Sequence, residues 1–244
     1  MGGAGEIGMN LNLYGYDNKW LMVDLGITFT NQLGIEVMMP DPKYIVERRK
    51  DLVGLVLTHA HEDHIGAVPY LWPYLKCPVY ATPFTAQVLR QKLEEKSWGK
   101  QVNIIEVPLS GRVQIGSFDI EYITLTHSIP EPNALAIRTS LGCVLHSGDW
   151  KIDPQPLLGK TTDKNRLKEI GKEGVLALIC DSTNVFDGGS TGSEGDVRDE
   201  LEKLIAQIPN GRIAVCCFSS NVARVESIAY AARRNGRKVA LVGR

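Results

Sequence analysis

Short apolar runs, separated by glycine, proline and charged residues, cover most of the first two thirds of the chain. Runs of this length with partial alternation predict β-strands. We expect strands over residues 19–25, at the apolar start of segment 52–66, and over 79–82, 102–107, 112–115, 118–125, 134–139 and 143–147. Helical spacing is confined there to residues 65–75, where Pro69 limits the regularity of a short helix, and 83–96, which has a proline near its start.

The pattern changes after residue 150. A polar and basic stretch at 160–172 predicts an exposed helical connection. Beyond it, apolar runs at 175–181, 212–218 and 238–242 alternate with helical spacing at 196–207 and 221–235, after a Gly/Ser-rich loop at 182–195. Strands that alternate with helices predict a parallel α/β unit. We therefore expect one domain over 1–175 and the start of a second, truncated domain over 176–244.

Composition narrows the class of protein. The chain has 244 residues, 43% hydrophobic and 23% charged, with a net charge of −1. These values are ordinary for a globular protein. Because the net charge gives no overall attraction for nucleic acid, binding of such a partner would need a local basic groove. The five cysteines are odd in number, sit mostly within apolar runs and form no CxxC pair. With no apolar run of membrane-spanning length and no signal-peptide pattern, a cytoplasmic protein with reduced thiols is expected, without a membrane partner.

The segment LVGLVLTHAHEDHIG, residues 52–66, leads an apolar strand into a cluster of ionisable side chains. His59 and His61 project to the same side of an extended segment, and a following turn carries Asp63 and His64 across a second position. Imidazoles and a carboxylate suit zinc or a similar transition ion, and four ligands in six positions can divide between two ions. The alternative is a polar turn at a helix start with Asp63 as its cap; the density of the cluster favours metal.

Two later strand ends carry the same kind of residue. The strand at 118–125 leads to His127, and the hairpin at 134–147 leads to His146 and Asp149. All five histidines of the chain lie at such strand ends, which favours one shared site over isolated loop histidines. Asp24 also ends a strand, where it either caps a turn or orients a metal-bound histidine.

Glycines at positions 2, 3, 5 and 8 precede the first strand. Glycines allow tight turns and the close approach of backbone N–H groups to an anion. An ordinary glycine turn and a phosphate-approach loop both remain open, because the βαβ context of a dinucleotide fingerprint is missing.

The pattern HxHxDH at 59–64 resembles the signature of the metallo-β-lactamase superfamily. Seven blocks together resemble the ribonuclease J family, in the β-CASP branch of that superfamily: GGAGEIGMN, VDLGITF, HAHEDHIGA, THSIPEPNAL, HSGDWKID, CDSTN with its GSTGSE sequel, and CFSSNVARV. The first five blocks belong to the metallo-β-lactamase part, and the last two mark entry into an inserted β-CASP domain. The resemblance implies an αββα sandwich followed by the beginning of a parallel α/β domain.

The resemblance also implies roles for individual residues. One zinc ion is expected on His59, His61 and His127, a second on Asp63 and His64, with Asp149 bridging the two. Asp63 and Asp149 are the expected catalytic carboxylates. Support for the metal shell is expected from Asp24, His146 and Asp181, and phosphate contacts from Gly2, Gly3, Ser219, Ser220 and Asn221.

Two positions depart from the family pattern. Ala223 stands where the second β-CASP motif usually has a histidine. The third motif contributes a further histidine to the second metal, and no residue here matches it because all five histidines are already assigned. We therefore expect a well-supplied first metal, a second metal one ligand short, and no normal activity from this stretch alone.

The implied function is hydrolysis of RNA phosphodiesters by water that two zinc ions activate. Similarity to the family further implies 5′-to-3′ exonuclease and endonuclease activity in rRNA processing and mRNA decay, preference for 5′-monophosphate ends, and a homodimer or homotetramer. One alternative is a small-molecule hydrolase of glyoxalase or lactonase type that uses the same metals. Another is an RNA-binding β-CASP subunit without catalysis.

Overall fold

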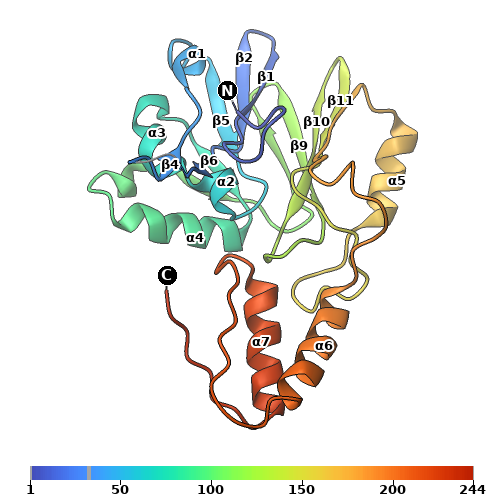
Figure 1. Ribbon diagram of the computed structural model, residues 1–244. Helices are drawn as coiled ribbons and strands as arrows, with labels where there is room; N and C mark the ends of the chain where they lie inside the picture. The colour runs from blue at the N-terminus through green and yellow to red at the C-terminus, as the bar shows by residue number, and fades with distance from the viewer. Residues whose placement is uncertain (1, 32–33, 244) are drawn as a thin grey trace.

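Two five-stranded sheets face each other in the computed structural model, which describes residues 2–31 and 34–243 (Figure 1). The first sheet has the order β1 (Asn12–Tyr16), β2 (Lys19–Val23), β5 (Leu52–Val56), β6 (Val79–Ala81) and β7 (Ile104–Glu106). The second has the order β12 (Ala177–Ile179), β11 (Gly142–His146), β10 (Asn133–Thr139), β9 (Phe118–Thr124) and β8 (Arg112–Ile115). A two-stranded hairpin, β3 (Thr28–Phe29) with β4 (Val37–Met38), stands apart from both.

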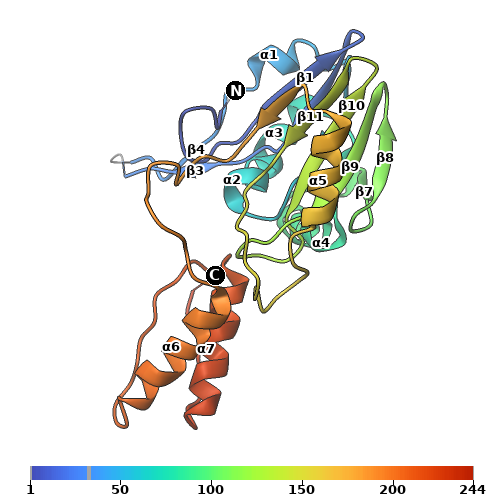
Figure 2. The ribbon, with the colours of Figure 1, turned by 90° about the vertical axis from the view of Figure 1, so that its right-hand side faces the viewer.

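Helices cover the outer face of each sheet. The first sheet carries α1 (Lys43–Val46), α2 (Glu62–Ile65), α3 (Val68–Leu75), α4 (Pro83–Glu94) and the short 3₁₀ helix η1 (Gly99–Gln101); the second carries α5 (Lys164–Glu173) (Figure 2). One hydrophobic cluster lies between the sheets and one lies under each helical layer. The αββα sandwich expected from the sequence is therefore confirmed.

The alternation of side chains along β2 shows how the sequence builds these layers. Leu21 and Val23 enter the cluster between the sheets, whereas Met22 enters the cluster under the outer helices. All three are fully buried. A strand covered on both faces is hydrophobic at every buried position. For this reason KWLMVDL has no polar side chain between Lys19 and Asp24.

The last helices, α6 (Glu194–Ala206) and α7 (Val222–Arg234), lie side by side and extend beyond one end of the sandwich (Figures 1 and 2). Ser193 begins α6 with a capping box in which its hydroxyl accepts the N–H of Asp196. Asn221 caps α7 by accepting the N–H of Arg224 at 2.9 Å. At the sandwich end of α7, the N–H of Ala223 donates to the carbonyl of Ser128 at 3.2 Å.

The strands expected at 212–218 and 238–242 do not form, and this part of the prediction was wrong. Val215, Phe218 and Leu241 remain exposed there. A strand is stable only when a neighbour satisfies its backbone groups. Within the described ranges the two runs line one cavity together but form no strand ladder. The run at 175–181 does form a strand, β12, but it pairs in parallel with β11 in the second sheet.

Two further outcomes concern boundaries. The helix expected over 65–75 begins later, as α3 at Val68, and a separate short helix, α2, precedes it and ends at Ile65. The division of the chain at 175/176 stays a prediction. Within the described ranges, no helix is long and apolar enough to cross a bilayer.

Candidate metal centre

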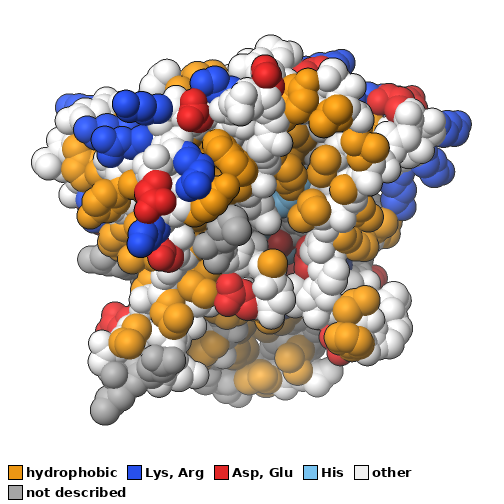
Figure 3. All heavy atoms as spheres, turned by 90° about the horizontal axis from the view of Figure 1, so that it is seen from above, with side chains coloured by type: hydrophobic (Ala, Val, Ile, Leu, Met, Phe, Trp, Pro, Cys, Tyr) orange, Lys and Arg blue, Asp and Glu red, His pale blue; other side chains and the backbone are white. Residues whose placement is uncertain are grey.

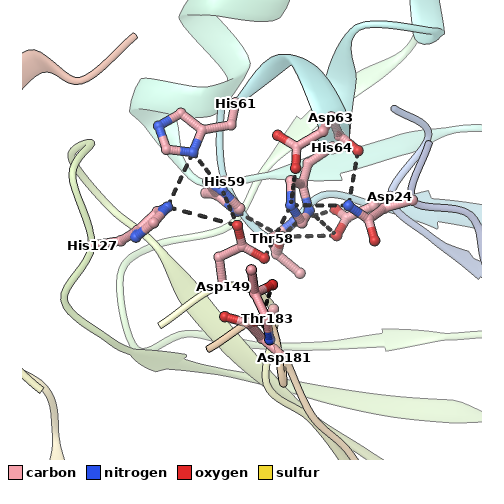
Figure 4. A network of polar contacts seen from close by, with 12 residues as sticks. Asp24, Thr58, His59, His61, Asp63, His64, His127, Asp149, Asp181 and Thr183 are labelled. Atoms are coloured by element: carbon pink, nitrogen blue, oxygen red, sulfur yellow. Dashed lines mark hydrogen bonds and ion pairs between the residues drawn. The ribbon is translucent and has the colours of Figure 1, made fainter. Parts of the chain in front are cut away.

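The metal-type side chains gather at one end of the sandwich because the strands that carry them end there. Asp24 follows β2, and His59 lies three residues after the end of β5. His61 precedes α2, so that Asp63 and His64 lie on the first turn of that helix. Loops after β9 and β11 supply the remaining two, His127 and Asp149 (Figure 4).

The residues that follow β2 pack directly against the turn that carries Asp63 and His64. The N–H of Leu25 donates to the carbonyl of His64 at 2.7 Å. A Cβ at Gly26 would lie 1.5 Å from the carbonyl oxygen of Asp63, so only glycine fits there. Asp24 itself has φ +59°, a left-handed conformation that Asp tolerates better than most residues. Sequence VDLG is thus required for this contact.

We call His59, His61, His127 and Asp149 the first metal group; one ligand atom from each lies within 4.8 Å of all the others. His61 Nδ1 lies 3.1 Å from both His59 Nε2 and His127 Nε2. The Asp149 carboxylate lies 4.0 Å from His59 Nε2 and 3.7 Å from His127 Nε2. Four ligand atoms converging in this way can surround one ion.

We call Asp63, His64 and Asp149 the second metal group, which meets the same 4.8 Å limit. His64 Nε2 lies 3.4 Å from the Asp63 carboxylate and 3.2 Å from that of Asp149. Asp149 presents Oδ2 to the first group and Oδ1 to the second, and so is the one residue common to both (Figure 4). The two groups contain the six residues that the resemblance assigns to two ions. That they bind metal stays a prediction.

The imidazoles of the first group are held neutral. Burial, with the neighbouring His127 as a second cause, lowers the pKa of His61 to about 4. Burial, followed by the adjacent imidazoles, keeps the pKa of His59 well below its ordinary value, and burial also lowers that of His127. A neutral imidazole has the free lone pair that metal binding requires.

The surroundings of His64 have the opposite effect and raise the pKa of its imidazole. Burial alone would lower its pKa, but the charge of Asp24 and hydrogen bonds to Asp149, Asp24 and Asp63 hold it well above the ordinary value. His64 Nδ1 lies 2.7 Å from Asp24 Oδ2. Asp24, fully buried, also accepts the N–H and hydroxyl of Thr58 at 2.8 and 2.9 Å. This contact orients the ring with Nε2 toward the metal position, as supporting carboxylates do.

A cavity of about 700 Å³ opens over the second metal group. Its wall includes the glycine turn from Gly3 to Gly8, the three residues of the second group, and the loop that carries Asp181, Thr183 and Phe186. Viewed from above, a small histidine surface lies at the bottom of a hollow (Figure 3). Phe186 is 98% exposed at this wall.

The three expected support residues all lie at this site. His146 is buried, lines the cavity and shares a 2.8 Å hydrogen bond between Nδ1 and Tyr14 Oη. The Asp181 carboxylate accepts the N–H and hydroxyl of Thr183 at 2.9 and 2.7 Å, and the Asp181 N–H donates to Ser147 Oγ. Asp24 contacts His64 as described above.

Of the five residues expected to contact phosphate, one lines the cavity. Gly3 lines the cavity, whereas Gly2 forms an isolated bridge to Leu11 outside it. Ser219, Ser220 and Asn221 lie at the start of α7, outside the residues that line the cavity. Their contact with phosphate stays a prediction.

Three residues at the site were missed by sequence reasoning. Thr58 binds Asp24, and Tyr14 binds His146. Asn10 donates from Nδ2 to the carbonyl of Asp63 and lies 3.2 Å from His64 Nε2. The only available signal was position: Thr58 precedes the histidine cluster, and Asn10 ends the glycine block.

The donor set fits divalent transition metals. Three imidazoles with one carboxylate, and one imidazole with two carboxylates, are combinations that zinc accepts. The lowered pKa values of the first group agree with this chemistry because lone pairs are free at neutral pH. The residues present therefore fit two ions.

Comparison with known proteins follows the same division of the chain. Residues 9–208 match the family model of the metallo-β-lactamase superfamily, and residues 210–244 match that of the ribonuclease J β-CASP domain. A crystal structure of a protein of unknown function from Enterococcus faecalis V583 superposes with a TM-score of 0.65 at 16% identity, covering 92% of this chain and 60% of that one. That likeness shows the fold.

Relatives with higher identity share one name. Ribonuclease J of Sinorhizobium meliloti is 48% identical, and ribonuclease J of Synechocystis is 42% identical, each over the whole of this chain. Ribonuclease J of Thermus thermophilus is 38% identical over the same extent. The chain covers 44%, 39% and 44% of these three proteins, and so spans less than half of their length.

Proposed function

Because the chain belongs to the metallo-β-lactamase superfamily and is similar to ribonucleases J along its whole length, we propose that it is the metal-binding part of a ribonuclease. The observation that carries the proposal is Asp149, which faces two ligand groups with its two carboxylate oxygens. A carboxylate shared in this way is the arrangement that two-metal phosphoesterases use. The substrate proposed is RNA, hydrolysed at its phosphodiester bonds.

His59, His61, His127 and Asp149 would hold one zinc ion, and Asp63, His64 and Asp149 the other. When bound, the two ions supply an activated water and stabilise negative charge on the attacked phosphate. Asp63 and Asp149, the proposed catalytic carboxylates, would orient that water and accept its proton, because both border the cavity and burial does not keep them protonated. Their pKa values are lowered, that of Asp149 to about 2, because the charge and hydrogen bonding of His64 outweigh burial.

The cavity supports a substrate larger than a water molecule. It is open, it is bordered by backbone of a glycine turn, and the second metal group lies at one of its walls. Gly2, Gly3, Ser219, Ser220 and Asn221 are the proposed phosphate contacts. His146 and Asp181 are proposed to support the metal shell from the cavity wall, and Asp24 from beneath His64.

Finer properties of the proposed enzyme rest on resemblance to the ribonuclease J family. These are 5′-to-3′ exonuclease and endonuclease activity, a 5′-monophosphate preference, a role in rRNA processing and mRNA decay, homo-oligomeric assembly, and a cytoplasmic location. We also propose that the β-CASP domain begins at residue 176. β12 nevertheless pairs with β11, so the proposed boundary lies just before a strand of the second sheet.

The function is tested with the full-length protein and a 5′-monophosphorylated RNA. The double variant H59A/D149A removes a ligand of the first group and the shared carboxylate, and RNA cleavage should be lost. D199N, which changes an exposed carboxylate on α6, is the matched control and should cleave normally. Undiminished cleavage by the double variant would contradict the proposal.

The same preparations distinguish the alternatives. Hydrolysis of a thioester or a lactone without RNA cleavage would identify a small-molecule hydrolase. Zinc content and RNA binding without turnover of any of these substrates would identify a non-catalytic RNA-binding subunit.

A further inference from the structure

Asn10 is attached to the Asp63–His64 turn by both its main chain and its side chain. Its N–H and its Nδ2 each donate to the carbonyl oxygen of Asp63 at 3.1 Å. Its own carbonyl accepts the N–H of Gly26 at 3.0 Å. Two hydrogen bonds therefore fix this half-buried residue against the turn that carries Asp63 and His64, and a third joins it to the residue that packs on that turn.

The contact with Asp63 determines which way the amide faces. If the amide were rotated by half a turn, Oδ1 would face the Asp63 carbonyl oxygen, and two acceptors would stand opposed. Nδ2 therefore faces the turn. One of its two N–H groups is used by Asp63, and the same nitrogen lies 3.2 Å from His64 Nε2.

His64 would offer no lone pair to the second N–H of Asn10 once the second metal group holds an ion. Nδ1 is engaged with Asp24 at 2.7 Å. Nε2 is the atom that His64 offers to the second metal group, 3.4 Å from the Asp63 carboxylate and 3.2 Å from that of Asp149, so an ion bound there would use its lone pair. The second amide N–H then requires an oxygen acceptor in the cavity, whose lining includes Asn10, Asp63 and His64.

We propose that Asn10 is a phosphate-binding residue that donates this second N–H to an oxygen of the phosphate held at the second metal group. The inference rests on the proposed function, which supplies a phosphate there. A hydrogen bond from a fixed amide to a charged oxygen contributes about 1.5–3 kcal/mol, or roughly a factor of 10–100 in affinity. Asn10 would thereby orient the phosphate before the attack of water.

The test measures binding of inorganic phosphate to the zinc-loaded, full-length protein by isothermal titration calorimetry, with zinc content determined by mass spectrometry. N10A should raise the phosphate dissociation constant at least about 10-fold while zinc content stays unchanged. N12A is the matched control: Asn12 lines the same cavity, two residues along the chain. Its phosphate affinity should equal that of the parent. N10L, which keeps the volume, decides the matter if N10A folds poorly.

Two results would overturn the assignment. Phosphate binding by N10A and N10L equal to that of the parent would show that the amide makes no such contact. Loss of zinc in both variants would show that Asn10 serves only to hold the Asp63–His64 turn. RNA cleavage is scored separately: a parent that binds phosphate through Asn10 but cleaves no RNA would refute the proposed ribonuclease function and leave the phosphate contact standing.

Discussion

The two metal groups share Asp149 and otherwise contrast in charge and support. The first group contains three imidazoles whose pKa values are lowered, chiefly by burial. The second contains a single imidazole, His64, whose pKa is raised because Asp24, Asp63 and Asp149 surround it. Neutral lone pairs are thus ready in the first group, whereas the second must release a proton before an ion can bind.

This difference shows that the residues that hold a metal ligand in place matter as much as the ligand itself. The second group has fewer ligands, and Asp24 holds the imidazole of His64 in place from beneath. Deep burial of Asp24 strengthens its interaction with the imidazole of His64. We therefore expect the second ion to be the weaker one and the more dependent on residues that do not touch it.

Removal of Asp149 should have the largest effect, because it alters both groups at once. D149A in the full-length protein is expected to lower RNA cleavage by at least about 10³-fold and to reduce zinc content. A steady-state cleavage assay with zinc analysis checks this. Retention of both ions and of activity would show that the two groups are not joined through Asp149.

Replacement of Asp24 should affect the second group alone. D24N keeps the size and a side chain that tolerates φ +59°, but it removes the charge that faces His64 Nδ1. Loss of such a supporting carboxylate typically weakens metal binding about 10- to 100-fold. Competition with a chromogenic chelator should therefore show one weakened zinc site and one unchanged site. Equal weakening of both would break the contrast.

The pH dependence of zinc binding should separate the groups further. His61, with a pKa of about 4, is already deprotonated at neutral pH, so affinity of the first group should change little between pH 6 and 8. His64 binds its proton more tightly than a free imidazole, so protons compete with zinc throughout that window. Affinity of the second group should rise with pH and be lost first on acidification. Chelator competition at several pH values measures both; parallel slopes would contradict the contrast.

Much of the metal centre could be predicted from the sequence because its ligands follow strand ends. Segment HAHEDH places four ligands within six positions, and His127 and Asp149 each follow an apolar strand. Neighbouring strands bring their ends to one edge of the sandwich, so proximity follows from pattern alone. The strands of the two sheets were predictable from their apolar runs, whereas the αββα layering was expected from the resemblance to the metallo-β-lactamase superfamily.

Contacts between residues far apart in the sequence could not be predicted from such a pattern. Asn10 and Asp63 are 53 positions apart, and Tyr14 and His146 are 132 apart. Neither asparagine nor tyrosine differs in type from ordinary loop and strand residues, so only coordinates reveal these pairs. The runs at 212–218 and 238–242 failed in the opposite way, because apolar propensity predicts a strand only where a partner strand exists.

The smallest effect expected concerns Tyr14, which supports His146 rather than a ligand. Y14F removes the hydroxyl 2.8 Å from His146 Nδ1 and leaves a buried polar atom without that bond. The expected loss of unfolding free energy is about 1–3 kcal/mol, with zinc affinity of both groups unchanged. Urea unfolding of the parent and Y14F, together with the chelator assay, measures both quantities. If zinc affinity of the second group fell as well, the supports of that group would extend across the two sheets to β1, and its contrast with the first group would be greater than Asp24 accounts for.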